Sequence, residues 1–216
     1  MHTKSEENYL KAIFKLNHFT QPFVSSKALS EELALSPSSI TEMLKKLHNK
    51  GLVNYKAYKG AELSLSGVHI AKLLIRKHRL WETFLVQKLG FNWSQIHKIA
   101  EELEHIQSFD LIDKLDKYLG MPKYDPHGNP IPNKIGQLNI DKYIKLIDAQ
   151  INKKYVVKAV IKDDEKFLTY LNSIAIHIDS ELQIKSKDNI NSIYKIQINK
   201  HLISVQLSVT SYILVH

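Results

Sequence analysis

The chain has 216 residues, of which 44% are hydrophobic and 24% charged, enough apolar material for one large domain or for two to three small ones. It contains no cysteine, which excludes disulfides, thiolate zinc sites, iron–sulfur clusters and cysteine nucleophiles. Thirty basic against 22 acidic side chains give a net charge of +8, which is compatible with a polyanionic partner.

Two further classes of protein find no support in the sequence. The seven glycines are not spaced as in a phosphate-binding loop or a dinucleotide fingerprint. No uncharged apolar run reaches the roughly 18 residues of a membrane helix, and the N-terminal residues lack the apolar stretch of a signal peptide. We therefore expect a cytoplasmic protein without a membrane partner.

Residues 1–75 carry the signals of three helices and a hairpin. Apolar residues at helical spacing predict a first helix over 6–16, and Ser25-Ser26 can cap a second. Ser36 followed by Pro37 predicts the start of a third helix, which Gly51 ends. Two short strands, 52–55 and 61–65, follow with Lys59-Gly60 in their turn. This order is that of a winged helix-turn-helix.

The third predicted helix is a candidate for insertion into a DNA major groove, because its first residues are small and polar. Residues 1–75 hold ten lysines and six glutamates, so half of the chain's net charge lies in this third of its length. The alternative is a protein-interaction module with a solvated basic face. The residues predicted to contact DNA are Pro37, Ser38, Ser39, Thr41, Lys45 and Lys46 on the helix, with Lys56 and Lys59 in or near the wing.

Residues 66–148 are predicted to be mostly helical. Ser66 can cap a long helix that runs to about Leu89, and Asn92 or Ser94 can start another that runs to about Ile106. A third helix is predicted over 109–119. Glycines and prolines then exclude helix from the segment that follows.

The last part of the chain changes character, because its apolar residues alternate with a period of two. This pattern predicts a small β-barrel interrupted by one short helix near 165–172. The predicted strands are 155–161, 182–185, 193–198, 202–209 and 212–215.

Imidazoles and carboxylates recur at spacings that suit a metal site. The predicted helix near residue 100 carries four of them at offsets i, i+4, i+7 and i+8, which share one helical face. The preceding helix carries a pair at i, i+4, and the turn-rich segment adds two more.

A single such pair is more often a solvated salt bridge, so the prediction of a metal site depends on the whole set. Without thiolate or thioether donors the set suits Mn²⁺, Fe²⁺, Co²⁺ or Zn²⁺. The candidates are His97, Glu101, Glu104 and His105, then His78 and Glu82, and finally Asp125 and His127.

Two metalloenzyme patterns are incomplete in this chain. Ferritin-like di-iron helices need two Glu-x-x-His pairs, and here only Glu102 and His105 form one. The segment from Glu101 to His105 resembles the His-x-x-Glu-His zinc-peptidase signature, but its first ligand is Glu. The sequence therefore does not favour an enzyme.

Five motifs, in order, resemble the DtxR/MntR family of metal-dependent transcriptional repressors. The resemblance extends over residues 4–135, and the C-terminal part is similar in length and strand pattern to the family's FeoA-type domain. The motifs are SEENYLKAI (5–13), SPSSITEMLKKL (36–47), RKHRLWE (76–82), AEELEH (100–105) and DPHGNPIP (125–132).

The resemblance implies a mainly α fold with a small β part: a winged helix-turn-helix domain over 1–75, a helical dimerisation and metal domain over 76–148, and an SH3-like (FeoA-type) β-barrel over 149–216. It implies a bacterial homodimer that takes Mn²⁺ or Fe²⁺ as co-repressor, with Zn²⁺ or Co²⁺ binding in vitro. The metal-loaded dimer would then bind a palindromic operator on double-stranded DNA and regulate metal-ion homeostasis.

The resemblance also implies two ligand sets. One is His78, Glu82 and His97, completed by Asp125, His127 and Asp163 or Glu165 near the start of the barrel helix. The other is Glu101, Glu104 and His105, with a residue of the first helix. At that position the family has Asp or Met and this chain has Asn8, for which the neighbouring Glu7 can substitute. Lys11 stands where manganese-type members have a metal-bridging Glu, so a close binuclear centre is not expected. Glu101 replaces the iron-type Cys, which favours Mn²⁺.

The implied mechanism is linkage between the metal and the spacing of the two recognition helices. The alternative is a winged-helix regulator that senses a small organic ligand and has a structural His/Glu cluster. DNA binding that persists after chelation would favour that alternative.

Overall fold

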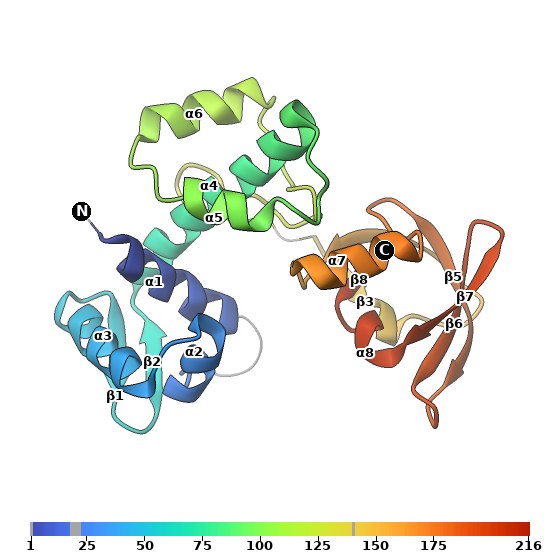
Figure 1. Cartoon of the computed structure of the whole chain (residues 1–216), viewed down its shortest axis with the longest axis horizontal. Helices are drawn as coiled ribbons and strands as arrows, with labels where there is room; N and C mark the ends of the chain where they lie inside the picture. The colour runs from blue at the N-terminus through green and yellow to red at the C-terminus, as the bar shows by residue number, and fades with distance from the viewer. Residues whose placement is uncertain (1, 18–22, 140) are drawn as a thin grey trace. The chain divides into compact units, whose positions relative to one another are not determined.

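The computed structural model describes residues 2–17, 23–139 and 141–216 (Figure 1). The chain divides into two compact units. No helix within these described residues is long and apolar enough to cross a membrane. The first unit comprises Met1–His78, Leu103–Gln107 and Pro132–Gln137. The second comprises Arg79–Glu102, Ser108–Ile131 and Leu138–His216.

The winged part of the first unit has the predicted element order. Apolar side chains from its three helices form its core, and Leu10, Leu29, Ile40 and Leu44 among them are fully buried. The two strands pair antiparallel. The elements are α1 (Lys4–Asn17), α2 (Ser26–Leu33), α3 (Pro37–Asn49), β1 (Val53–Lys56) and β2 (Gly60–Leu63).

Local signals set the ends of these helices. The hydroxyl of Ser25 accepts a hydrogen bond from the backbone N–H of Ala28, and Ser36 caps α3 in the same way, as predicted. Gly60 begins β2 at φ +103°, where a Cβ would lie 2.0 Å from the carbonyl oxygen of Val24. Only glycine allows this close approach, which holds the hairpin against the segment before α2.

Helix α4 (Leu65–Leu89) is the long predicted helix, and α6 (Phe109–Tyr118) also follows the prediction. The cap of α4 is Ser64, whose hydroxyl accepts from Gly67, rather than the predicted Ser66. Helix α5 (His97–Leu103) is shorter than predicted at both ends. Residues 104 and 105 therefore do not belong to a helix, and the prediction of four ligands on one helical stripe is wrong.

The C-terminal part forms a six-stranded antiparallel sheet in the order β3-β8-β4-β5-β6-β7, with a core that includes Val157, Leu168, Ile184 and Ile213. The predicted strand over 202–209 is wrong in its second half, because β7 ends at Gln206 and a short helix follows. The elements are β3 (Ile144–Lys145), η1 (Leu146–Asp148), β4 (Lys154–Val160), α7 (Glu165–Ser173), β5 (Glu181–Asp188), β6 (Ile193–Ile198), β7 (His201–Gln206), α8 (Leu207–Thr210) and β8 (Ile213–Val215).

Candidate metal centre

The turn after α6 is rigid and presents two candidate ligands. Oδ1 of Asp125 accepts hydrogen bonds from the backbone N–H groups of His127 (2.8 Å) and Asn129 (2.9 Å). Gly128 has a φ of +80°, and a Cβ there would lie 1.9 Å from the carbonyl oxygen of Lys158 in β4. The turn is therefore fixed against the sheet, and the His127 side chain is fully buried.

The ring of His127 is oriented for coordination. Its Nε2 lies 2.9 Å from the carbonyl oxygen of Trp93, an acceptor, so Nε2 carries the proton and Nδ1 carries the lone pair. Nδ1 is buried and has no hydrogen-bond partner among the described residues, while Oε2 of Glu82 lies 3.8 Å away. Ligand atoms of Glu82, Asp125 and His127 lie within 4.8 Å of one another. These three residues are called the Glu82 cluster below.

The charges in the Glu82 cluster favour a cation. Burial, together with the negative charge of Glu82, raises the pKa of Asp125, although the charge of Arg79 opposes the rise. Nε of Arg79 lies 3.3 Å from Oδ2 of Asp125. The buried carboxylates of Asp125 and Glu82 are oxygen ligands of the kind that a divalent cation takes together with imidazole nitrogen.

His97 at the start of α5 extends this set. Its Nδ1 lies 3.5 Å from Oε1 of Glu82 and 3.7 Å from Oδ2 of Asp163, which follows β4. Its Nε2 lies 3.3 Å from the half-exposed carboxylate of Glu101. Glu165 instead pairs with Lys98, both exposed. Asp163 is therefore better placed than Glu165 to contribute from the barrel.

His78 lies on the same face of α4 as Glu82, because residues four apart share a face of one helix. It lies one turn before Glu82 on that helix. Glu82 is 1% exposed. A metal bound through Glu82 can therefore draw on several imidazoles.

A second set of candidates surrounds Glu104, which is 1% exposed. Its Oε2 lies 2.5 Å from Nδ1 of His78 and 2.6 Å from Nζ of Lys11. Burial alone raises the pKa of Glu104, but the hydrogen bond from His78 and the charge of Lys11 outweigh burial and hold this pKa below its ordinary value. These three residues, with Glu7 and His105, are called the Glu104 cluster.

Glu7 and His105 complete the contact between α1 and the segment 103–107. Nδ1 of His105 lies 2.6 Å from Oε2 of Glu7, whose other oxygen accepts from Gln107 at 3.0 Å. Nε2 of His105 is buried without a hydrogen-bond partner in the described part of the chain, and it lies 3.7 Å from Oε1 of Glu104. Asn8 is half-buried on the same helix. These pairings explain why α5 ends at Leu103.

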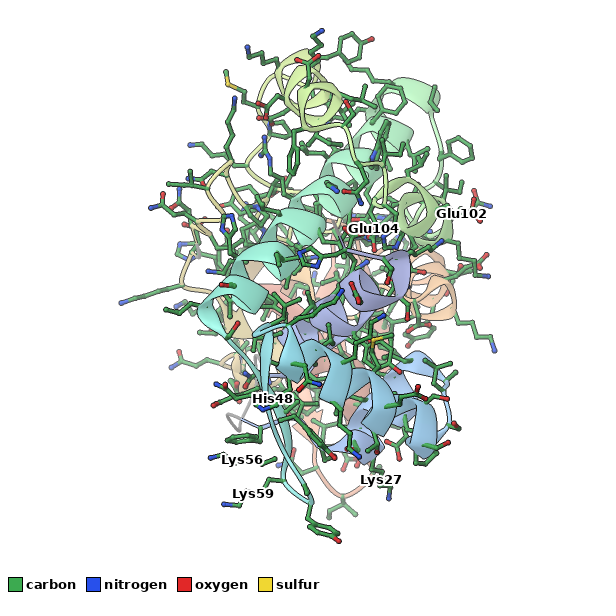
Figure 2. The ribbon with its side chains drawn as sticks, turned by 90° about the vertical axis from the view of Figure 1, so that its left-hand side faces the viewer. Lys27, His48, Lys56, Lys59, Glu102 and Glu104 are labelled. Carbon is green, nitrogen blue, oxygen red and sulfur yellow. The ribbon has the colours of Figure 1, made fainter. Side chains whose placement is uncertain are left out.

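The predicted DNA-binding residues lie mostly at the surface of the winged part. Pro37, Ser38, Ser39, Lys45 and Lys46 are exposed on α3. Thr41 is half-buried, and its hydroxyl donates to the carbonyl oxygen of Pro37 at 2.9 Å. Figure 2 shows Lys56 and Lys59 of the hairpin, with Lys27 of α2, extending from one end of this part.

One buried residue of this region was missed by the sequence reasoning. Glu6 is 0% exposed, and its Oε1 accepts from Lys50 at 2.7 Å and from Lys46 at 3.1 Å. Burial alone raises the pKa of Glu6, but the hydrogen bonds from Lys50 and Lys46 lower it to about 2. The helical spacing of Glu6 next to buried Tyr9 and Leu10 was the available signal, since it placed this carboxylate on an inner face.

Comparison with known proteins agrees with the fold. Three family descriptions match: "Iron dependent repressor, N-terminal DNA binding domain" over residues 1–61, "Iron dependent repressor, metal binding and dimerisation domain" over 65–133, and "FeoA domain" over 144–216. A solved "Manganese-dependent transcriptional repressor complex with manganese" is 32% identical, with a TM-score of 0.89 over 97% of this chain and 98% of that chain.

Curated relatives are matched over different shares of their length. The "HTH-type transcriptional regulator MntR" of Oceanobacillus iheyensis is 31% identical over 152 residues, which are 70% of this chain and 97% of that protein. A "Probable metal transport system membrane protein" of Chlamydia trachomatis is 41% identical over 88 residues, or 41% of this chain, but the chain spans only 19% of that protein.

The chain belongs to the family of metal-dependent transcriptional repressors, with a winged helix-turn-helix, a helical metal-binding and dimerisation region and an SH3-like FeoA domain. The members of this family are transcriptional regulators. These findings do not favour the alternative of a regulator that senses a small organic ligand.

Proposed function

We propose that this protein is a repressor that binds Mn²⁺ or Fe²⁺ and then binds operator DNA to control metal-ion homeostasis. The observation that carries the proposal is the Glu82 cluster. It holds two buried carboxylates and an imidazole whose Nδ1 is oriented and without a hydrogen-bond partner among the described residues. Oxygen and imidazole ligands without thiolate suit Mn²⁺ and Fe²⁺.

The ligand assignment is part of this proposal. Glu82, Asp125 and His127 form the main site, with His78, His97 and Asp163 as further ligands. Glu104 and His105 of the Glu104 cluster hold a weaker second ion, and Glu7 rather than Asn8 supplies the α1 contact, because its carboxylate already lies 2.6 Å from His105. The half-exposed Glu101 lies at the edge of the main site, and Glu165 takes no part.

The DNA-binding assignment rests on α3. Its exposed serines lie near the helix N-terminus, where they can approach base edges, and its lysines lie about two turns later, where they can reach phosphates. The wing lysines extend this basic surface. DNA as the partner also implies a cytoplasmic protein, and regulation by binding implies no catalysis.

A homodimer is part of the proposal. Large apolar side chains of the second unit remain exposed at the end of α4, on α6 and in the segments that follow these helices, which favours a two-fold interface there: Leu89, Phe91, Phe109, Leu111, Tyr118 and Met121. Leu85, Ile112 and Leu115 are buried within the unit itself, so they are not part of this surface.

The decisive experiment is selection of DNA from a random-sequence pool by the purified protein, with Mn²⁺ and again after chelation. We expect a palindromic sequence to be enriched only with Mn²⁺. Fluorescence anisotropy on the enriched sequence should then show a ten- to hundredfold gain in affinity, which corresponds to about 1.4–2.8 kcal/mol of coupling. Equal enrichment with and without metal would refute metal dependence.

A further inference from the structure

The Glu104 cluster contains a lysine that the proposed function does not use. Lys11 of α1 is only 6% exposed, and lysine is almost never buried to this degree unless its charge is paired. Its ammonium lies 2.6 Å from Oε2 of Glu104 and 3.2 Å from Nδ1 of His78. It thus lies between a carboxylate and an imidazole, the two ligand types that otherwise hold a metal in this chain.

The proton positions in the Glu104 cluster follow from what each group can donate. Lysine has donors only, so Lys11 donates to Oε2 of Glu104. Nδ1 of His78 lies 2.5 Å from the same oxygen, so it also carries a proton and donates. Oε2 of Glu104 therefore already receives one full positive charge and one further hydrogen bond.

The other oxygen of Glu104 and the ring of His105 are not supplied with donors in this way. Oε1 of Glu104 lies 3.7 Å from Nε2 of His105, which is buried and finds no hydrogen-bond partner in the described residues. Nδ1 of His105 lies beside the carboxylate of Glu7 and donates to it, so Nε2 carries a lone pair. This half of the cluster can accept a cation, but the charge of Lys11 opposes a second positive ion a few ångströms away.

We propose that Lys11 is a resident cation of the Glu104 cluster, which neutralises Glu104 and fastens α1 to the segment 103–107 when no metal is bound there. This inference rests on the proposed function and concerns its regulation. The ammonium takes the place of one metal ion, so Mn²⁺ binds this cluster in competition with Lys11. The Glu82 cluster then carries most of the metal response.

The test compares the wild type with Lys11→Glu and Lys4→Glu. Both variants change the charge of α1 by the same amount, but Lys4 is exposed at the start of the helix. Mn²⁺ bound per chain is measured by equilibrium dialysis and metal analysis, and Tm is measured with and without Mn²⁺.

We expect Lys11→Glu to bind about one more Mn²⁺ per chain, because a carboxylate replaces the competing cation. We also expect a lower Tm without metal and a larger rise in Tm with Mn²⁺. Lys4→Glu should match the wild type.

Lys11→Met keeps the length of the side chain and removes its charge, so it carries the test if Lys11→Glu does not fold. We expect a lower metal-free Tm and a larger Mn²⁺-induced rise in Tm for this variant too. Unchanged Mn²⁺ content and an unchanged rise in Tm in the variant that folds would overturn the proposal. Failure of the wild type to bind DNA with Mn²⁺ would instead refute the proposed function, and Mn²⁺ content would still report on Lys11.

Discussion

The Glu82 cluster and the Glu104 cluster are built from the same residue types, but their basic side chains are placed differently. Each cluster holds two buried carboxylates and one buried imidazole nitrogen without a hydrogen-bond partner within the described residues. In the Glu82 cluster the partly exposed guanidinium of Arg79 lies 3.3 Å from Asp125. In the Glu104 cluster the buried ammonium of Lys11 lies 2.6 Å from Glu104. The closer, buried cation neutralises its carboxylate more fully and competes more strongly with a metal ion.

The difference shows that ligand-type residues do not by themselves define a metal site. Burial of an unneutralised carboxylate costs free energy, which either a metal or a basic side chain can offset. In our proposal the Glu82 cluster uses a metal ion for this purpose and therefore responds to metal concentration, whereas the Glu104 cluster uses Lys11 when no metal is bound there.

The largest effect is expected from breaking the Glu104 cluster. Glu104→Ala removes the carboxylate that neutralises the buried ammonium of Lys11, and loss of one member of such a pair costs about 3–5 kcal/mol of unfolding free energy. Urea unfolding of the metal-free protein measures the change. The double variant Glu104→Ala/Lys11→Met should recover most of the loss, since no buried charge then lacks its partner. A double variant as unstable as Glu104→Ala would contradict the pairing.

The next effect is expected from breaking the Glu82 cluster. Glu82→Gln removes one of the two buried carboxylates of the Glu82 cluster, and operator affinity at fixed Mn²⁺ should fall by about 100-fold, or about 2.8 kcal/mol. Metal-free affinity should stay as it is. Fluorescence anisotropy measures both. The control is Glu165→Gln, which makes the same change at an exposed carboxylate paired with Lys98. Equal losses in the two variants would remove Glu82 from the metal site.

A smaller effect is expected from Glu6, a second buried carboxylate that is paired with lysine. The pKa of Glu6 is lowered from 4.5 to about 2, so its ionised form stabilises the fold above pH 4.5, and this contribution is lost as the pH falls towards 2. Glu6→Gln should lower the unfolding free energy by about 1–2 kcal/mol at pH 7, because Lys46 and Lys50 are partly solvated. Chemical unfolding across this pH range should show the two proteins converging. A constant difference from pH 7 to 2 would refute the assignment.

The smallest effect is expected on the salt dependence of operator binding, where two neighbouring lysines of α3 should differ. Lys45 has no ion pair among the described residues, whereas Lys46 lies 3.1 Å from Glu6 and is 51% exposed. Lys45→Ala should reduce the log–log salt slope of operator binding by up to about 0.9, the value for one phosphate contact, and Lys46→Ala by less. Anisotropy at several salt concentrations measures both slopes. Unchanged slopes in both variants would remove these lysines from the DNA interface.

The sequence determined much of this protein through local interactions. Serine caps, Pro37 and Gly51 set the ends of the winged-part helices, because these interactions involve residues only a few positions apart. The period-two alternation predicted the strands from 154 onward. The residue types of the candidate ligands followed from the absence of cysteine and from the spacing of His and Glu.

Tertiary structure decided which of those residues meet. Periodicity extended α5 to Ile106, but the pairing of Glu104 with Lys11 and of His105 with Glu7 separates both residues from that helix. These partners are 93 and 98 positions apart in the chain, and no local pattern encodes such a contact. The same holds for the charge balance that distinguishes the two clusters, because burial and a partner's charge depend on the folded chain and not on sequence spacing.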